Sequence, residues 1–146
     1  MAVASEGTGR AGLVFGDRMD TDVNASLRGR VAFVTGASSG MGRHFSALLA
    51  GHGAAVALVA RRLDALEEIS ASIQATGARA IPIACDIADR DAVRAAVNRA
   101  EELLDGVPTI VVNSGGIIER IPAIEMPEEK WDRVIRTNLT GTFNVA

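Results

Sequence analysis

Short apolar runs alternate with amphipathic stretches along most of the chain, from about residue 30 to its end. The runs predict strands at residues 31–35, 55–60, 79–84 and 109–112. Each run is apolar throughout, which is typical of parallel strands covered on both faces. Because the segments between the runs have the period of amphipathic helices, the pattern predicts a doubly wound, Rossmann-like α/β fold. Its parallel sheet should hold about four strands.

Helix boundaries are predicted from the apolar period and from capping residues. Helices are expected at residues 41–52 and 63–76, from Asp89 to about residue 105, and from about Pro127 onward. Gly53, Gly77 and Gly106 are expected to end the first three helices, and Asp89 to cap the start of the third. The first helix gathers its large apolar residues on one face, the usual pattern of a helix that packs on a core. These residues are Met41, Phe45, Leu48 and Leu49.

The first 26 residues differ from the rest of the chain. They combine glycines with small and charged residues and show no sustained period. Residues 1–26 are therefore expected to be a mobile arm without a function of its own. Residues 27–146 are expected to form the folded α/β domain.

Composition narrows the class of protein. The chain is 48% hydrophobic and 23% charged with a net charge of −3, which predicts a globular domain that binds neither nucleic acid nor a membrane surface. No apolar run reaches membrane-spanning length and no apolar signal core is present, so a cytoplasmic protein is expected. Cys85 is the single cysteine, which suits a reducing compartment. His44 and His52 have no third ligand nearby, so no metal site is expected.

The sequence T-G-A-S-S-G-M-G, at Thr35–Gly42, lies between the first predicted strand and the first predicted helix. Backbone N–H groups at a helix start, together with the helix dipole, favour an anion at that position. Glycines allow a sharp turn and a close approach of phosphate to the backbone, and Ser38 and Ser39 add hydroxyl donors. The segment predicts a phosphate-binding turn, with an ordinary glycine-rich connection as the alternative.

This segment resembles the T-G-x-x-x-G-x-G cofactor motif of the short-chain dehydrogenase/reductase family, in its compact single-domain branch. Four further segments match the family in order: Ala60-Arg61-Arg62, Asp86-Ile87, Asn113-Ser114-Gly115-Gly116 and Asn138-Leu139. The resemblance covers about residues 28–146. One segment departs from the family pattern N-N-A-G, because Ser114 replaces the second Asn and Gly115 replaces the Ala. Both replacements are small and leave room for a cofactor ribose.

The resemblance implies that residues 27–146 are the N-terminal portion of a dinucleotide-binding Rossmann domain. Its cofactor-binding residues are expected to be Gly36, Ser38, Ser39, Gly40, Met41, Gly42, Arg61, Arg62, Asp86, Ile87, Asn113 and Gly115. In this fold an acid after the second strand binds the ribose of NAD, whereas an arginine accommodates the 2′-phosphate of NADP. Positions 60–62 hold two arginines and no acid, so NADP is expected rather than NAD, and the resemblance favours Arg61 as its ligand. The alternative is that both arginines are solvated at a helix start, where their charge opposes the dipole.

Two polar residues receive roles from the resemblance. Asp86 is expected to accept a hydrogen bond from the adenine amino group, with Ile87 near the base; a turn residue is the alternative. Asn138 is assigned to catalysis, as the residue that holds a water in a proton relay to a catalytic Lys. Its spacing from Trp131 and Val134 places it on the apolar face of the last helix, where a buried amide must be hydrogen-bonded. A bond to a neighbouring backbone carbonyl is the alternative, and the two roles are compatible.

The resemblance implies an NADP-preferring oxidoreductase that transfers hydride between the cofactor and a carbonyl or alcohol substrate, and that is a homo-oligomer when complete. The family's catalytic Ser, Tyr and Lys follow the last helix seen here. The chain contains no tyrosine, and its only lysine, Lys130, lies in the polar first turn of that helix. The chain is therefore expected to be the N-terminal portion of an enzyme, with the C-terminal part missing, and to be inactive by itself. A non-catalytic nucleotide-binding or regulatory module from a truncated gene is the alternative. An open reading frame that continues past Ala146 into S…Y-x-x-x-K favours the enzyme.

Overall fold

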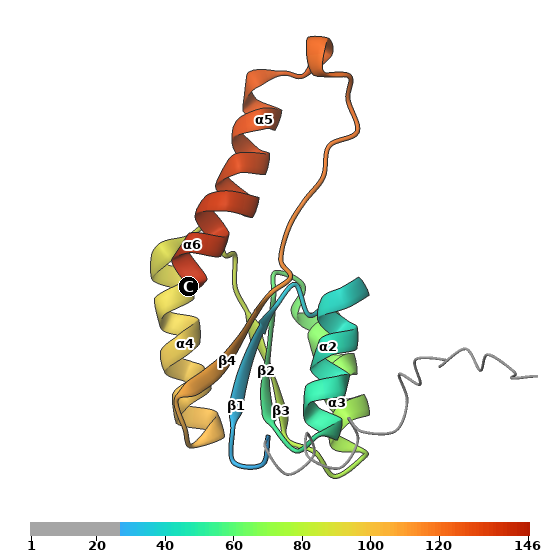
Figure 1. The fold of residues 1–146 in the computed structure, drawn as a ribbon, viewed down its shortest axis with the longest axis vertical. Helices are drawn as coiled ribbons and strands as arrows, with labels where there is room; N and C mark the ends of the chain where they lie inside the picture. Colours follow the sequence, from blue (N-terminus) through green and yellow to red (C-terminus); the bar gives the residue numbers. More distant parts are fainter. Residues whose placement is uncertain (1–26) are drawn as a thin grey trace, which may run out of the picture.

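Four parallel strands form the centre of the molecule, in the order β3-β2-β1-β4 (Figure 1). The computed structural model describes residues 27–146, so the predicted mobile arm, residues 1–26, lies outside the described residues. The strands are β1 (Val31–Thr35), β2 (Ala55–Ala60), β3 (Ala80–Ala84) and β4 (Pro108–Asn113). The chain runs outward from β1 to β3 and returns to the other side of β1. The topological switch point, beside which ligands bind in such folds, therefore lies between β1 and β4. The predicted doubly wound fold is confirmed.

Helices cover both faces of the sheet (Figure 1). One face is covered by α2 (Gly40–Gly51) and α3 (Leu63–Gln74), and the other by α4 (Arg90–Leu104). After β4 come a 3₁₀-helix, η1 (Ala123–Glu125), then α5 (Glu128–Ile135), a π-helical turn, η2 (Arg136–Thr140), and α6 (Gly141–Val145). Alternate side chains of β1 pack against the helices on opposite faces of the sheet: Phe33 lies on the α4 side and Val34 on the α2 side.

Most element boundaries agree with the apolar pattern. Asp89 caps α4 as predicted, because its carboxylate accepts the N–H groups of Asp91 and Ala92. The helix α4 ends at Leu104, close to the predicted stop at Gly106, and the residue before that glycine turns the chain. The residue with left-handed backbone is Asp105, at φ 54°, and not Gly106. Aspartate tolerates this conformation better than most residues that carry a Cβ, so the helix ends without needing glycine there.

Of the four large apolar residues expected on the packing face of α2, Leu49 alone packs against the core, and it is partly buried. Met41, Phe45 and Leu48 are 70%, 37% and 45% exposed. The buried positions are instead the small residues Gly42, Ser46 and Ala50, spaced four apart. Small side chains on this face let the helix lie close to the sheet, so helix and strand backbones approach each other. The expected packing face of α2 was therefore wrong for Met41, Phe45 and Leu48 and right for Leu49, because close approach outweighed hydrophobic bulk.

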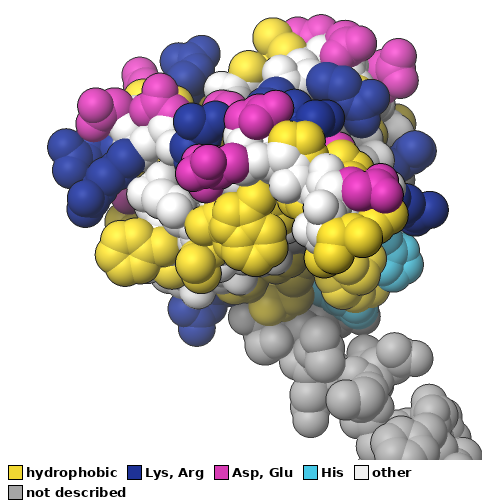
Figure 2. Space-filling view, turned by 90° about the horizontal axis from the view of Figure 1, so that it is seen from above, with side chains coloured by type: hydrophobic (Ala, Val, Ile, Leu, Met, Phe, Trp, Pro, Cys, Tyr) yellow, Lys and Arg dark blue, Asp and Glu magenta, His cyan; other side chains and the backbone are white. Residues whose placement is uncertain are grey.

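The outer edge of β4 has no strand beside it within residues 27–146. Large apolar side chains on β4 and on the helical segments after it are exposed, among them Val111, Trp131, Leu139 and Phe143. Figure 2 shows hydrophobic side chains gathered along one side of this end of the molecule, whereas charged side chains occupy the other side. The apolar face predicted for the last helix is thus largely exposed. None of the described helices has the length and apolar character needed to cross a membrane.

Candidate cofactor-binding site

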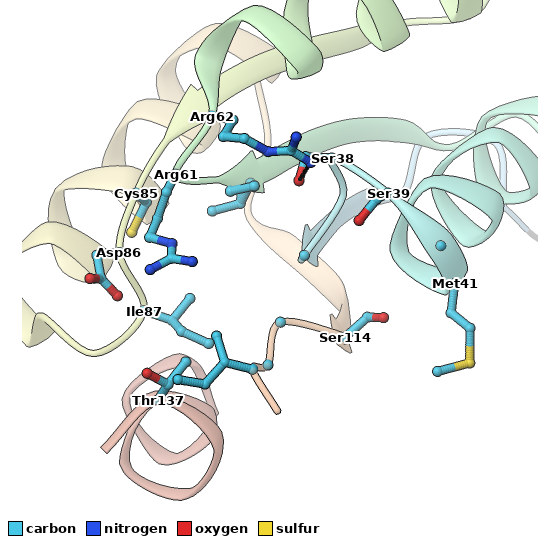
Figure 3. A pocket seen from close by; sticks show the side chains of 17 residues that line it. Ser38, Ser39, Met41, Arg61, Arg62, Cys85, Asp86, Ile87, Ser114 and Thr137 are labelled. Carbon is cyan, nitrogen blue, oxygen red and sulfur yellow. Dashed lines mark hydrogen bonds between the residues drawn. The ribbon is translucent and has the colours of Figure 1, made fainter. Parts of the chain in front are cut away.

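A cavity of about 470 Å³ lies where the carboxyl ends of the strands meet the loops that follow them. Its lining comes from segments after all four strands, together with Thr137 of η2 (Figure 3). Ten of the predicted cofactor residues line it: Gly36, Ser38, Ser39, Gly40, Met41, Arg61, Arg62, Asp86, Ile87 and Gly115. Gly42, Asn113 and Asn138 do not line it. The fold thus brings most of the predicted set to one place.

The glycine-rich turn after β1 owes its shape to backbone contacts. Gly36 has a φ of +65°, and a Cβ there would lie 2.5 Å from the carbonyl oxygen of Ser114. A Cβ on Gly42 would overlap the carbonyl group of Gly36. Gly40, with a φ of +53°, faces open space, since no protein atom lies within 4 Å of its Cβ position. Gly36 and Gly42 therefore allow close packing, whereas Gly40 leaves its backbone accessible from the cavity.

The start of α2 is a helix N-terminus without a side-chain cap. Ser39, the N-cap residue, makes no side-chain hydrogen bond to the helix, and the first turn holds no acidic residue. By contrast, α4 is capped by Asp89 and carries Asp91 in its first turn. An uncapped N-terminus that opens into a cavity leaves N–H groups and a partial positive charge available to an anion.

Thr35, at the end of β1, joins the glycine-rich turn to the loop after β4. Its buried hydroxyl accepts the N–H groups of Ser114 and Gly115, at 3.2 and 3.1 Å, and donates to the carbonyl of Val112 at 3.4 Å. The loop after β4 is therefore fixed against β1, and Gly115 is held at the cavity wall. This role of Thr35 was not expected from the sequence, because it depends on the pairing of β1 with β4.

The two arginines after β2 point to different parts of the cavity. Arg62 donates a hydrogen bond of 3.4 Å to the hydroxyl of Ser38 and so reaches the glycine-rich turn. Arg61 extends toward Asp86 and Ile87 (Figure 3). Both side chains are exposed, and a phosphate between β2 and the glycine-rich turn would lie beside the guanidinium group of Arg62.

The loop after β3 forms the opposite wall. One carboxylate oxygen of Asp86 accepts the N–H of Ala88 at 3.0 Å, as a turn-forming aspartate does. The side chain still lines the cavity, so the turn role and a ligand role coexist. Ile87 is buried, and its carbonyl accepts a hydrogen bond from the Asn144 side chain at 2.9 Å. The position of this wall is thus fixed from α6.

Cys85 also lines the cavity, although the sequence analysis did not assign it to the site. Burial raises the pKa of its thiol from 9.0 to about 11, and the nearby carboxylates of Asp86 and Asp89 act in the same direction. The thiol therefore stays protonated at neutral pH and acts as a small apolar wall element. Further lining residues that the sequence analysis did not assign are Val59, Ala60, Ser114, Gly116, Ile117 and Thr137.

Asn138 lies in the π-helical turn and holds the loop after β4. Its side-chain amide donates to the carbonyl of Ile117 at 2.9 Å and accepts the N–H of Ile117 at 2.8 Å. The expectation that Asn138 is buried among apolar residues was wrong, since the residue is exposed. Trp131 and Leu139, which were expected on the same apolar face, are 57% and 65% exposed, so that face is itself largely open. The alternative, a bond to a neighbouring backbone carbonyl, is what the structure shows.

Glu119 ties the same loop to α5. Its carboxylate, only 14% exposed, pairs with Lys130 and Arg133. The loop is therefore fixed at two points: Asn138 holds Ile117, and α5 holds Glu119.

The parallel sheet, the uncapped start of α2 and the cavity at the carboxyl ends of the strands are typical of α/β proteins that bind nucleotides. Comparison with known sequences identifies the family. The sequence profile described as short chain dehydrogenase matches residues 30–146. The chain therefore belongs to the short chain dehydrogenase family.

Individual relatives agree with this assignment. D-threitol dehydrogenase of Mycolicibacterium smegmatis is 34% identical over 125 residues, which cover 86% of this chain and 48% of that protein. Glycine betaine reductase of Emericella nidulans is 40% identical over 118 residues, which cover 81% of this chain and 9% of that protein. The crystal structure of a short-chain type dehydrogenase/reductase from Mycobacterium marinum superposes with a TM-score of 0.78 at 37% identity, over 82% of this chain and 48% of that one. The chain thus spans about half, or less, of the length of the relatives it matches.

Proposed function

We propose that the cavity binds NADP(H), and that the chain is the N-terminal part of an oxidoreductase. The enzyme moves a hydride between the nicotinamide and a carbonyl or alcohol carbon. The proposed preference for NADP rests on the residues at the end of β2. Residues 60–62 hold two arginines and no carboxylate, and Arg62 contacts Ser38 of the glycine-rich turn. A guanidinium forms charge-assisted hydrogen bonds to a phosphate, whereas a carboxylate at this point would repel it.

The cavity fits a dinucleotide in size and chemistry. Its volume of about 470 Å³ lies within the range of roughly 300–1,000 Å³ that is usual for small-molecule sites. The uncapped start of α2 and the open backbone at Gly40 suit a pyrophosphate, and the wall of Asp86 and Ile87 suits an adenine. When bound, the dinucleotide would supply or accept the hydride. The residues of this chain bind and orient it.

We propose that Asn138 contributes to proton transfer. It would do so by holding a water near the loop after β4, which it fixes. Reduction of a carbonyl near neutral pH needs a proton donor within hydrogen-bond reach of the developing alkoxide. The 146 residues contain no tyrosine. We therefore propose that the acid–base group lies outside this chain, and that residues 1–146 alone do not catalyse hydride transfer. The second candidate, a nucleotide-binding module without catalysis, is favoured by the same absence of tyrosine.

Titration calorimetry of the protein with NADPH and NADH tests the cofactor assignment. Arg61→Ala and Arg62→Ala are each expected to weaken NADPH binding about tenfold, because a charge-assisted hydrogen bond to phosphate is lost. NADH binding should stay within about twofold, since NADH has no 2′-phosphate. Arg99→Ala, which removes the same charge from an exposed position on α4, is the matched control. Equal losses for both cofactors would remove the two arginines from the phosphate site.

A further inference from the structure

A second cavity, of about 500 Å³, adjoins the first on the side of Asp86. The two cavities share Arg61, Asp86 and Thr137. The second cavity is otherwise lined by Ala88, Asp89, Arg90, Arg133 and Arg136. Half of its lining side chains are thus arginines, and we call it the arginine cavity. The dinucleotide site proposed above uses only Arg61 of these four.

The acidic groups of the arginine cavity are engaged with backbone. Asp86 accepts the N–H of Ala88 at 3.0 Å, and Asp89 accepts the N–H groups of Asp91 and Ala92 at 2.9 and 3.0 Å. These bonds fix both carboxylates in turn and cap geometry, so neither reaches an arginine as an ion-pair partner.

The arginines divide into one paired group and three unpaired ones. Arg133 is neutralised by Glu119. Within residues 27–146, the guanidinium groups of Arg61, Arg90 and Arg136 form no hydrogen bond or ion pair with another side chain. Four arginines face two aspartates on this lining, so the cavity keeps an excess of positive charge, and an anion beside the unpaired guanidinium groups would be attracted to it.

The three unpaired arginines come from different elements. Arg61 follows β2, Arg90 is the first residue of α4, and Arg136 is the first residue of η2. The planar fork of guanidinium matches the oxygens of a phosphate, and several forks around one cavity can engage different oxygens. The first N–H groups of α4 are already capped by Asp89. An anion here would therefore be held by side chains, with only a general contribution from the helix dipole.

We propose that the arginine cavity binds a phosphate monoester, with Arg90 and Arg136 as ligands beside the shared Arg61. This phosphate has two sources to distinguish: the 2′-phosphate of a dinucleotide in the first cavity, which would then lie at Arg61 and not beside Arg62, or a separate phosphorylated molecule. Only the first source rests on the proposed function. The second stands on the arginine cavity alone.

The test uses Arg90→Gln and Arg136→Gln, with Arg99→Gln as a control that removes the same charge from a part of α4 outside the cavity. Inorganic phosphate is titrated into the protein without dinucleotide, and binding is followed by calorimetry. The wild-type protein and the control should bind phosphate equally. Each cavity variant should bind it about tenfold more weakly. Thermal unfolding checks that the variants remain folded, as expected for glutamine at exposed positions.

Titration with NADPH and NADH then separates the two sources. If Arg136→Gln weakens NADPH and leaves NADH unchanged, the phosphate is that of the dinucleotide. If both dinucleotides bind as in the wild type while phosphate binding is lost, the ligand is a separate molecule. Absence of any NADPH preference would defeat the proposed function but not this inference, provided that phosphate binding still depends on Arg90 and Arg136. The inference is overturned if the wild-type protein binds no phosphate, or if Arg99→Gln loses as much affinity as the cavity variants.

Discussion

Replacing Gly42 with alanine tests whether the close approach of α2 to the glycine-rich turn shapes the cavity. A Cβ at this position would overlap the carbonyl oxygen and carbon of Gly36, and it would lie 3.0 Å from the backbone nitrogen of Ala37. All three are backbone atoms. No side-chain rotation can relieve the overlap, so either the helix or the turn has to move.

The expected magnitude follows from two opposing effects. Forcing an extra methyl group into close packing costs about 1–3 kcal/mol. Alanine in place of a helical glycine returns roughly 0.5–1 kcal/mol. The net loss should be about 1–2 kcal/mol, which lowers the Tm of a domain of this size by roughly 4–8 °C. Dinucleotide binding should weaken at least about tenfold, because the N–H groups at the start of α2 no longer point to one place.

Gly51→Ala is the matched control. Gly51 lies in the same helix, but no atom lies within 4 Å of its Cβ position. This variant should keep the wild-type affinity and should be as stable as the wild type or slightly more stable. Circular dichroism melting and fluorescence titration with NADPH measure both quantities. A Gly42→Ala protein that melts and binds like the wild type would refute the argument that this glycine is required by contact.

Three further predictions concern the loop after β4, the buried thiol and the sheet edge. Asn138→Leu removes both hydrogen bonds to Ile117 and should lower kcat of the active enzyme with little change in cofactor Kd; steady-state kinetics with normal turnover would make Asn138 purely structural. The Cys85 thiol has a pKa of about 11 against 9.0 when unfolded, so the unfolded chain loses its proton first as pH rises. Stability should therefore decrease between pH 9 and 11, and urea unfolding should show a smaller decrease for Cys85→Ala. Residues 1–146 expressed alone should self-associate through the open edge of β4 and show no turnover with NADPH and carbonyl compounds; light scattering that reports a stable monomer, together with saturable turnover, contradicts this expectation.

Strand positions were predictable because the sheet is buried on both faces. Every side chain of β1 is buried, so the sequence reads as one apolar run with sharp ends. The roles of the site residues were predicted from the family resemblance, and the strand ends explain why these residues meet. Gly36 and Arg61 come directly after a parallel strand and Asp86 two residues after one, and parallel strands end at one edge of the sheet. Residues distant in sequence could therefore be assigned to one cavity before any contact was known.

The features that could not be predicted depend on contacts across the fold. The packing face of α2 is set by how closely its backbone approaches the turn at Gly36, and hydrophobic period carries no information about that distance. Asn138 is exposed together with Trp131 and Leu139, and the apolar period of a helix does not reveal whether its apolar face is covered. Thr137 reaches the cavity from a helix that follows the loop after β4, so no strand end pointed to it.

The strand order also has a consequence for the route by which the protein folds. β1, β2 and β3 pair with strands that are neighbours in the chain, whereas the bond between Thr35 and Val112 closes a separation of 77 residues. Local pairing closes small loops and forms early, so β1 to β3 with α2 and α3 should assemble while β4 is still being synthesised. The glycine-rich turn is not complete at that stage, because Ser114 and Gly115 have not yet been anchored by Thr35. Nucleotide binding should then appear only with the last step of sheet assembly. Cellular nucleotide would act as a late stabiliser of newly made chains by binding the assembled state and not its precursor.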